Sequence, residues 1–195
     1  MKKVLVILII ILLQTSSVMA DNFNNVKRIM EGDKNAKITI LVYESLTCSH
    51  CANFHINVFP DLKKDYIDTG IVKIEFRHFP LDVAALNASK VSQCKNDGET
   101  DILNSLYLNQ SKWIKGATLE KINKNLEEFL KTEGINLNFD KCIKNKNLEN
   151  FILNDRVEGA KKFKINATPT IIINGEKFEK SLNYKNLKKS LEKMI

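Results

Sequence analysis

The sequence predicts an α/β fold in which a β-α-β unit and a β-β-α unit lie on either side of a helical insertion. Short β-branched segments flank residues 81–154, a stretch with apolar residues at helical spacing and no proline. A Cys-x-x-Cys motif, Cys48 to Cys51, begins four residues after the first of these segments. Together these observations predict one sheet-containing domain with a helical subdomain inserted into it.

The first twenty residues predict a secretory signal peptide. Lys2 and Lys3 precede an apolar run over residues 4–13, and the small residue Ala20 ends the segment. A run of about ten apolar residues is too short to span a hydrocarbon core of about 30 Å, so an uncleaved membrane anchor is the weaker alternative. We expect the mature chain to begin at Asp21 and to reside in the periplasm.

The charge pattern excludes one broad class of function. The chain has a formal net charge of +7, and only three of its 30 basic residues are arginines. The lysines are dispersed among acidic residues, whereas surfaces that bind nucleic acid are usually clustered and arginine-rich. We therefore expect no nucleic-acid partner.

The first half of the chain predicts strand, helix and strand. Residues 37–43 (KITILVY) form a nearly continuous apolar run, which is typical of a strand covered on both faces. The following helix should bury one stripe of side chains and kink at Pro60. Residues 71–76 predict the next strand. The stripe consists of Cys51, Phe54, Val58, Leu62 and Tyr66.

The second half predicts three or four helices and then a return to the sheet. The insertion covers residues 81–154, and a further helix is expected over about 156–163. Residues 170–173 and 177–178 predict two strands joined by an Asn174-Gly175 hairpin turn. A final amphipathic helix carries Leu182, Leu187, Leu191 and Met194. With parts at residues 21–80, 81–154 and 155–195, this is the order of a thioredoxin fold with a helical insertion.

The CxxC motif predicts a redox centre. Residues three apart on the first turn of a helix face the same side, and the helix N-terminus favours an anion. Cys48 should therefore be the reactive sulfur, which is attacked in the disulfide and attacks as a thiolate when reduced. Its pKa should lie below the ordinary value, and Cys51 should be the buried partner. Ser49 and His50 should tune the reduction potential, with His50 adding positive charge. No cofactor beyond the Cys48–Cys51 disulfide is expected.

Two other readings of the motif remain. A structural staple is disfavoured because so small a loop restrains little of the chain. A zinc site would need further ligands such as His50 or His55, but structural zinc sites usually draw a second ligand pair from elsewhere. We expect no metal, and we expect His55 and His78 to be ordinary surface or partly packed histidines.

Thr168-Pro169 is the second informative point. Proline cannot donate to a sheet ladder, yet Pro169 opens a strand. A cis bond there would leave the Thr168 backbone free to bind an extended segment. The alternative is a proline that only marks a strand edge.

The segment from Val42 to Asp82 resembles the first half of DsbA-like thiol:disulfide oxidoreductases, in particular alphaproteobacterial ones, and "ATPTIIINGEKF" resembles their cis-proline segment. The resemblance implies catalytic roles for Cys48 and Cys51 and a substrate-binding role for Thr168 and Pro169. Many relatives carry an acidic residue six positions before the first cysteine. Val42 stands there in this sequence, and Glu44 lies four positions before Cys48, so a buried carboxylate is not carried over.

Cys94 and Cys142 complete the set of cysteines. Four cysteines allow three connectivities, of which one close pair and one distant pair is the simplest. The family resemblance implies a second, non-catalytic disulfide between these two residues. A role in modulating the active-site potential is the alternative to a structural one.

These observations predict a periplasmic enzyme that introduces disulfides into reduced, unfolded exported proteins. The resemblance implies a DsbB-type membrane partner that reoxidises it, and the short segment before the first strand favours a monomer. A disulfide isomerase or reductase of the same fold is the alternative within this class. A non-enzymatic chaperone or binding protein is the alternative from another class. Substrate is expected to lie in a groove roofed partly by the helical insertion.

Overall fold

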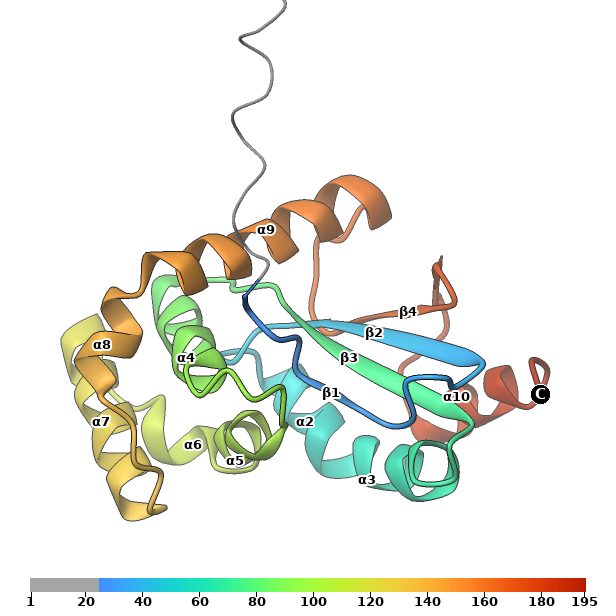
Figure 1. Cartoon of the computed structure of the whole chain (residues 1–195), viewed down its shortest axis with the longest axis horizontal. Helices are drawn as coiled ribbons and strands as arrows, with labels where there is room; N and C mark the ends of the chain where they lie inside the picture. Colours follow the sequence, from blue (N-terminus) through green and yellow to red (C-terminus); the bar gives the residue numbers. More distant parts are fainter. Residues whose placement is uncertain (1–24) are drawn as a thin grey trace, which may run out of the picture.

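A five-stranded sheet with helices on both faces forms the centre of the computed structural model, which describes residues 25–195 (Figure 1). The strands lie in the order β1-β3-β2-β4-β5. Their bounds are β1 Met30–Glu31, β2 Ile38–Glu44, β3 Val72–His78, β4 Thr170–Ile173 and β5 Glu176–Lys177. The expected signal peptide lies outside the described residues. No helix within residues 25–195 is long and apolar enough to cross a membrane.

The pairing of the strands confirms the expected β-α-β and β-β-α units. Strands β2 and β3 are parallel, with Val42 opposite Phe76, whereas β4 pairs antiparallel with β2. The turn between β4 and β5 has positive φ at both Asn174 and Gly175, the backbone conformation that an Asn-Gly hairpin turn supplies. The short strand β1 adds an antiparallel edge that the sequence analysis did not predict.

Strand β2 is buried on both faces, as its apolar run predicted. Val42 belongs to the main core with the helix that follows it, whereas Tyr43 packs with Phe79, Ile165 and Ile172 on the opposite face. Helix α9 (Lys146–Phe163) lies along this second face, above the sheet in Figure 1. Gly159 permits the close approach, because a Cβ there would come within 2.7 Å of the Tyr43 ring.

The helix after the CxxC motif is interrupted before Pro60, not kinked at it. Helix α2 (Ser49–Asn57) ends at Val58, and the chain continues as α3 (Phe59–Leu62) and a π-helical turn over Lys63–Ile67. Proline fits the first turn of a helix, so a new helix begins around Pro60. The five residues of the predicted stripe are nevertheless buried, and none is more than 5% exposed. Burying a large apolar side chain of this kind stabilises the fold by about 1.5–3 kcal/mol.

The insertion consists of helices only, as expected. It contains five helices before α9 instead of the expected three or four, and two of the five are short. Helix α9 begins ten residues earlier than predicted, at Lys146, because Asn145 caps it by accepting a hydrogen bond from the Leu148 amide. It therefore crosses the boundary expected after residue 154. The helices are α4 Val83–Gln93, α5 Asp101–Leu108, α6 Gln110–Trp113, α7 Leu119–Thr132 and α8 Phe139–Lys144.

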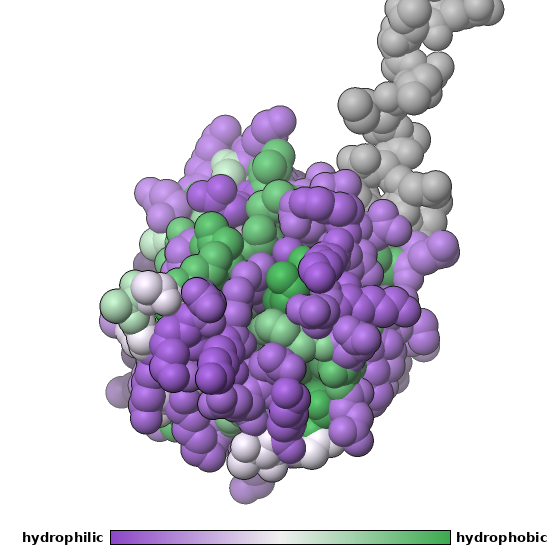
Figure 2. Space-filling view, turned by 90° about the vertical axis from the view of Figure 1, so that its left-hand side faces the viewer, coloured by the Kyte–Doolittle hydropathy of each residue, from purple (hydrophilic) through white to green (hydrophobic). Residues whose placement is uncertain are grey.

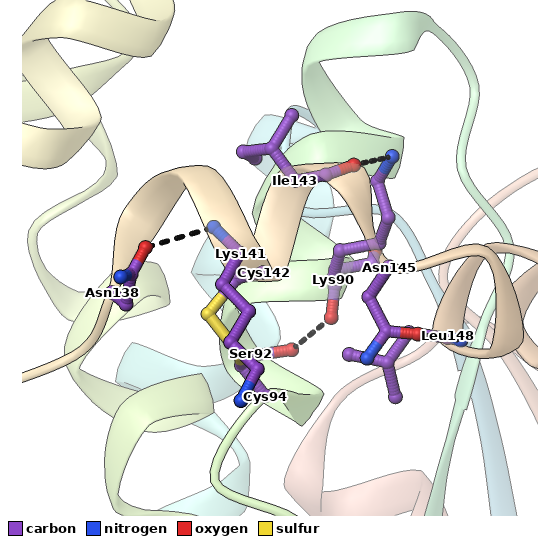
Figure 3. Close-up of a disulfide and its surroundings, with 10 residues drawn as sticks. Lys90, Ser92, Cys94, Asn138, Lys141, Cys142, Ile143, Asn145 and Leu148 are labelled. Atoms are coloured by element: carbon purple, nitrogen blue, oxygen red, sulfur yellow. Dashed lines mark hydrogen bonds between the residues drawn. A yellow bond between two sulfur atoms is a disulfide. The ribbon is translucent and has the colours of Figure 1, made fainter.

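A disulfide holds the insertion together. Cys94, at the end of α4, bonds to Cys142 in α8, and the two residues are 48 positions apart in the sequence (Figure 3). Beside it the buried Lys90 donates to the Ile143 carbonyl at 2.7 Å, which satisfies a backbone group at the end of α8. Seen from the side of the insertion, the surface is mainly polar and interrupted by apolar patches (Figure 2). Helix α10 (Tyr184–Leu191) is the last helix along the chain and packs against α3.

Candidate active site at the N-terminus of helix α2

Cys48 is the N-cap residue of α2. Its carbonyl oxygen accepts hydrogen bonds from the Cys51 and Ala52 amides at 3.1 and 3.2 Å, so the motif forms the first turn of the helix. Cys51 is buried one turn further along, whereas Cys48 is half-buried, and both are free thiols in the structure. This arrangement places one reactive sulfur at the surface and its partner beneath it.

The surroundings of Cys48 lower the pKa of its thiol to about 5. The largest cause is a hydrogen bond from the Cys51 thiol, and the Thr168 side chain and the backbone N–H groups of Cys51 and His50 add to it, against partial burial. The Thr168 hydroxyl is buried beside the sulfur but forms no hydrogen bond of standard geometry among the described residues. At neutral pH Cys48 is therefore a thiolate.

The side chains of Ser49 and His50 are exposed. We expected the positive charge of His50 to add to the stabilisation of the thiolate by the helix N-terminus. In the structure the contribution of His50 comes through its backbone N–H, and the neighbouring Cys51 thiol contributes most. The helix N-terminus thus acts through short-range hydrogen bonds to the sulfur.

Cys51 has the opposite tendency. Burial raises the pKa of its thiol far above the ordinary value, and the hydrogen bond to Cys48 and the charge of Glu44 raise it further. The Ser45 amide donates to its sulfur at 3.5 Å. One cysteine is therefore ionised and the other protonated at neutral pH, so in the reduced pair Cys48 is the nucleophile and Cys51 holds a proton.

The Thr168–Pro169 peptide bond is cis, and this loop faces the CxxC motif. When it is protonated, the Cys48 thiol donates to the Thr168 carbonyl oxygen at 3.3 Å, a bond that the thiolate does not form. Beside this contact is a cavity of about 320 Å³ lined by His50, Asn53, Phe54, Val58, Thr168, Pro169 and Leu182. The groove was expected to be roofed partly by the insertion, but the residues that line this cavity come from α2, the Val58 junction and the C-terminal part of the chain.

The insertion instead holds the active-site loop in place. Gln110 of α6 donates from Nε2 to the carbonyls of Leu46 and Cys48 at 2.8 and 3.0 Å. Thr47 donates to Asp82 at 2.7 Å, and Asp82 also caps α4. The residues just before and within the motif are therefore fixed from a second part of the fold.

Glu44, at the end of β2, is a buried carboxyl beneath the motif that the sequence analysis did not assign. It is 1% exposed, and its Oε2 lies 2.8 Å from His55 Nε2. The expectation that His55 and His78 are surface or partly packed residues is wrong, because each is only 2% exposed. Glu44 has the same strand parity as Val42, so it reaches the same sheet face two residues nearer to the motif.

The environment of Glu44 suits proton transfer. Burial raises the pKa of its carboxyl, opposed by the charge of His55 and by hydrogen bonding to His55 and Tyr107. Tyr107 nonetheless forms no hydrogen bond of standard geometry with Glu44 Oε1, which has no partner among the described residues. That oxygen is free to accept or deliver a proton. Within residues 25–195, no group of three or more histidine, cysteine and acidic side chains is arranged to hold a metal ion.

Comparison with known proteins agrees with this geometry. The family profile described as thioredoxin matches residues 24–193. The crystal structure of alpha-DsbA1 from Wolbachia pipientis matches with a TM-score of 0.76 and 30% sequence identity, over 85% of this chain and 89% of that one. The chain belongs to the DsbA-like thioredoxin family. The expected fold class, an α/β thioredoxin fold with a helical insertion, is thereby confirmed.

Relatives of this DsbA-like chain include proteins of two further genera. A Rickettsia conorii protein described as a protein-disulfide oxidoreductase is 30% identical over 147 residues, which are 74% of this chain and 52% of that protein. Disulfide bond formation protein D of Bacillus subtilis is 27% identical over 175 residues, 84% of this chain and 75% of that protein. The chain spans about half the length of the rickettsial relative.

Proposed function

We propose that this protein is a periplasmic thiol:disulfide oxidoreductase that introduces disulfides into reduced, unfolded exported proteins. The observation that carries the proposal is the difference between the two thiols, with the pKa of Cys48 lowered to about 5 and that of Cys51 raised. A stabilised thiolate stabilises the reduced form of the motif. The disulfide is then the stronger oxidant, and about 30 mV corresponds to a tenfold change in equilibrium.

The reaction proceeds in two exchanges. A substrate thiolate attacks Cys48 Sγ, a substrate–Cys48 disulfide forms, and the Cys48–Cys51 bond breaks as Cys51 leaves with the electron pair and takes up a proton. A second substrate thiolate then attacks the substrate sulfur of this mixed disulfide, and Cys48 leaves as a thiolate. The substrate has lost two electrons, which the CxxC pair now holds as one thiolate and one thiol.

Substrate recognition is assigned to the cavity beside the motif. An extended segment would lie against the Thr168–Pro169 loop and place its cysteine next to Cys48, which is the more accessible sulfur of the pair. The lining combines the apolar Phe54, Val58 and Leu182 with polar groups, so it offers little sequence selectivity. That is suited to a catalyst acting on many unfolded chains.

The catalyst needs an acceptor for the two electrons after each cycle. Membership of the DsbA-like family supports a DsbB-type membrane partner that restores the Cys48–Cys51 disulfide. A monomer satisfies the mechanism, because every group used above comes from one chain. The second disulfide, Cys94–Cys142, is proposed to be structural.

Oxidative refolding tests the proposal. The oxidised protein should accelerate disulfide formation in a reduced, unfolded substrate, and Cys48→Ala should abolish this activity. Reduction of insulin or repair of scrambled disulfides, without net oxidation, would instead show a reductase or an isomerase. Suppression of aggregation that survives Cys48→Ala, again without oxidation, would show a binding protein.

A further inference from the structure

A buried chain of polar groups connects the helical insertion to the carboxyl beneath the motif. His55 Nε2 lies 2.8 Å from Glu44 Oε2, and His55 Nδ1 lies 3.1 Å from Asn104 Oδ1. Asn104 belongs to α5 of the insertion, Glu44 to β2 and His55 to α2. Three elements therefore meet at one imidazole ring.

The Asn104 acceptor at one end of this chain determines where the protons of the Glu44–His55 pair lie. An amide oxygen only accepts hydrogen bonds, so His55 Nδ1 must carry a hydrogen. A neutral ring then has a bare Nε2, which requires Glu44 to be protonated, because two lone pairs would repel at 2.8 Å. If Nε2 is also protonated, the ring is a cation facing a carboxylate. In both cases the Glu44–His55 pair is neutral overall and holds one proton between its two members.

Aromatic rings enclose the pair, and the charge of Glu44 acts on Cys51. The His55 ring stacks on Tyr107 with 4.1 Å between centroids and is also bordered by Phe54, Phe59 and Phe76. The amide of Ser45, the residue after Glu44, donates a hydrogen bond to the Cys51 sulfur at 3.5 Å. The other titratable groups around the pair are Cys48 and Cys51 of α2, Tyr107 of α5 and His78, the register partner of Glu44 in β3.

The chemistry of the proposed function needs such a proton. When a thiolate attacks Cys48, the Cys51 sulfur departs with the bonding electron pair, and a thiol of high pKa leaves slowly as an anion. Protonation of the leaving sulfur removes this obstacle, and a positioned acid typically contributes a factor of about 10² to 10⁴. After giving up its proton, the pair has two facing lone pairs and takes up another proton from solvent.

We propose that Asn104 is a positioning residue that fixes the protonated Nδ1 form of His55, so that the Glu44–His55 pair always carries one transferable proton for Cys51. The inference rests on the proposed function only in that Cys48 and Cys51 exchange disulfides, in either direction. Without the Asn104 acceptor, the neutral ring adopts the Nε2–H form and donates to a Glu44 carboxylate. That pair carries a negative charge and has no proton to give.

Two substitutions of similar size separate these states. Asn104→Leu removes the acceptor, whereas Asn104→Asp keeps an oxygen acceptor facing Nδ1. Asn104 is half-buried and borders a cavity of about 950 Å³, so neither change disrupts the apolar core. Circular dichroism of each variant confirms that it is folded before the comparison is made.

Nitrogen-15 NMR of the His55 ring gives the direct test. In the wild type and in Asn104→Asp, Nδ1 should stay protonated across neutral pH, and Asn104→Leu should shift the ring to the Nε2–H form. A wild-type ring with a bare Nδ1 would overturn the proposal whatever the variants do, because the amide would then be donating to it.

The rate of disulfide reduction by glutathione gives the second test. Asn104→Leu and Glu44→Gln should each slow reduction about tenfold or more, the double variant should be no slower than Glu44→Gln, and Asn104→Asp should be clearly faster than Asn104→Leu. Wild-type rates in Asn104→Leu would refute the proposal. Normal glutathione kinetics with no oxidative refolding would count against the proposed function alone.

Discussion

The Cys48 thiol lies 3.3 Å from the Thr168 carbonyl oxygen, although the two residues are 120 positions apart in the sequence. The contact joins the start of α2 to the loop before β4 and makes one site from the two halves of the thioredoxin fold. It also places the Thr168 hydroxyl next to the sulfur, where that side chain lowers the pKa of Cys48. Both motifs that the sequence marked out are therefore parts of one redox site.

Thr168→Val should raise the pKa of Cys48 and make its disulfide less oxidising. The change removes the hydroxyl and keeps the shape, and the loss of an interaction of about 1 kcal/mol with the thiolate corresponds to about 20 mV for a two-electron couple. Equilibration with glutathione measures the potential. Thr170→Val is the matched control, because the Thr170 hydroxyl donates to the Ala167 carbonyl and is not among the main groups that shift the pKa of Cys48. Equal potentials in the two variants would contradict the assignment.

Gln110→Leu should loosen the active-site loop. It leaves the carbonyls of Leu46 and Cys48 without their donor, which should lower the free energy of unfolding by about 2 kcal/mol. Hydrogen exchange at the Cys48 amide, which bonds to the Ser45 carbonyl, should become faster.

Asn109→Leu serves as the control for Gln110→Leu. It also removes a side-chain hydrogen bond in this region, but that bond ends on the Ser105 carbonyl within the insertion. Faster exchange at Cys48 in both variants would mean that the insertion stabilises the loop only in a general way.

Replacing Cys94 and Cys142 by serine should destabilise the fold and leave the active site unchanged. Opening a loop with a sequence separation of 48 removes up to about 4 kcal/mol on the chain-entropy model. The free energy of unfolding should fall accordingly, with the pKa of Cys48 unaltered. A change in the Cys48–Cys51 potential well beyond about 30 mV would show instead that the second disulfide modulates the first.

His78 should make the fold sensitive to mild acid. Burial lowers the pKa of its ring to about 4. The unfolded chain binds a proton below about pH 6.5 and the folded chain does not until about pH 4, so stability is lost across this interval, by about 3 kcal/mol in full. Denaturant unfolding of His78→Gln should show a smaller loss over the same interval.

His50→Gln is the comparison for His78→Gln, since His50 is exposed. Its unfolding free energy should keep the loss between about pH 6.5 and about pH 4 that His78 causes. If both variants lose stability with pH in the same way as the wild type, the buried His78 ring is not the group responsible.

The sequence predicted the parts of this site that depend on local pattern. The apolar stripe beginning at Cys51 correctly predicted the position of α2 and the burial of Cys51, even though the helix is interrupted at Val58. The Asn174-Gly175 turn gave the hairpin, and the spacing of Cys48 and Cys51 gave the first helical turn. Each of these signals lies within a few residues of the feature it predicts.

Residues that act through tertiary contacts were missed. Glu44 was set aside because the acidic position of the family falls on Val42, although strand parity places both side chains on one face. His55 was expected at the surface because periodicity did not show that α5 packs over it. Gln110 carries no local signal, since its two acceptors are more than 60 positions away.

Titration of the Cys48 thiol tests the central claim most directly. The reduced protein should show a thiolate ultraviolet absorbance that disappears with a midpoint near pH 5. The free energy of unfolding of the reduced protein, compared with that of the oxidised protein, should fall as the pH drops through that value. A midpoint close to that of an ordinary cysteine, about 8.5, would leave the disulfide without oxidising strength and would contradict the account.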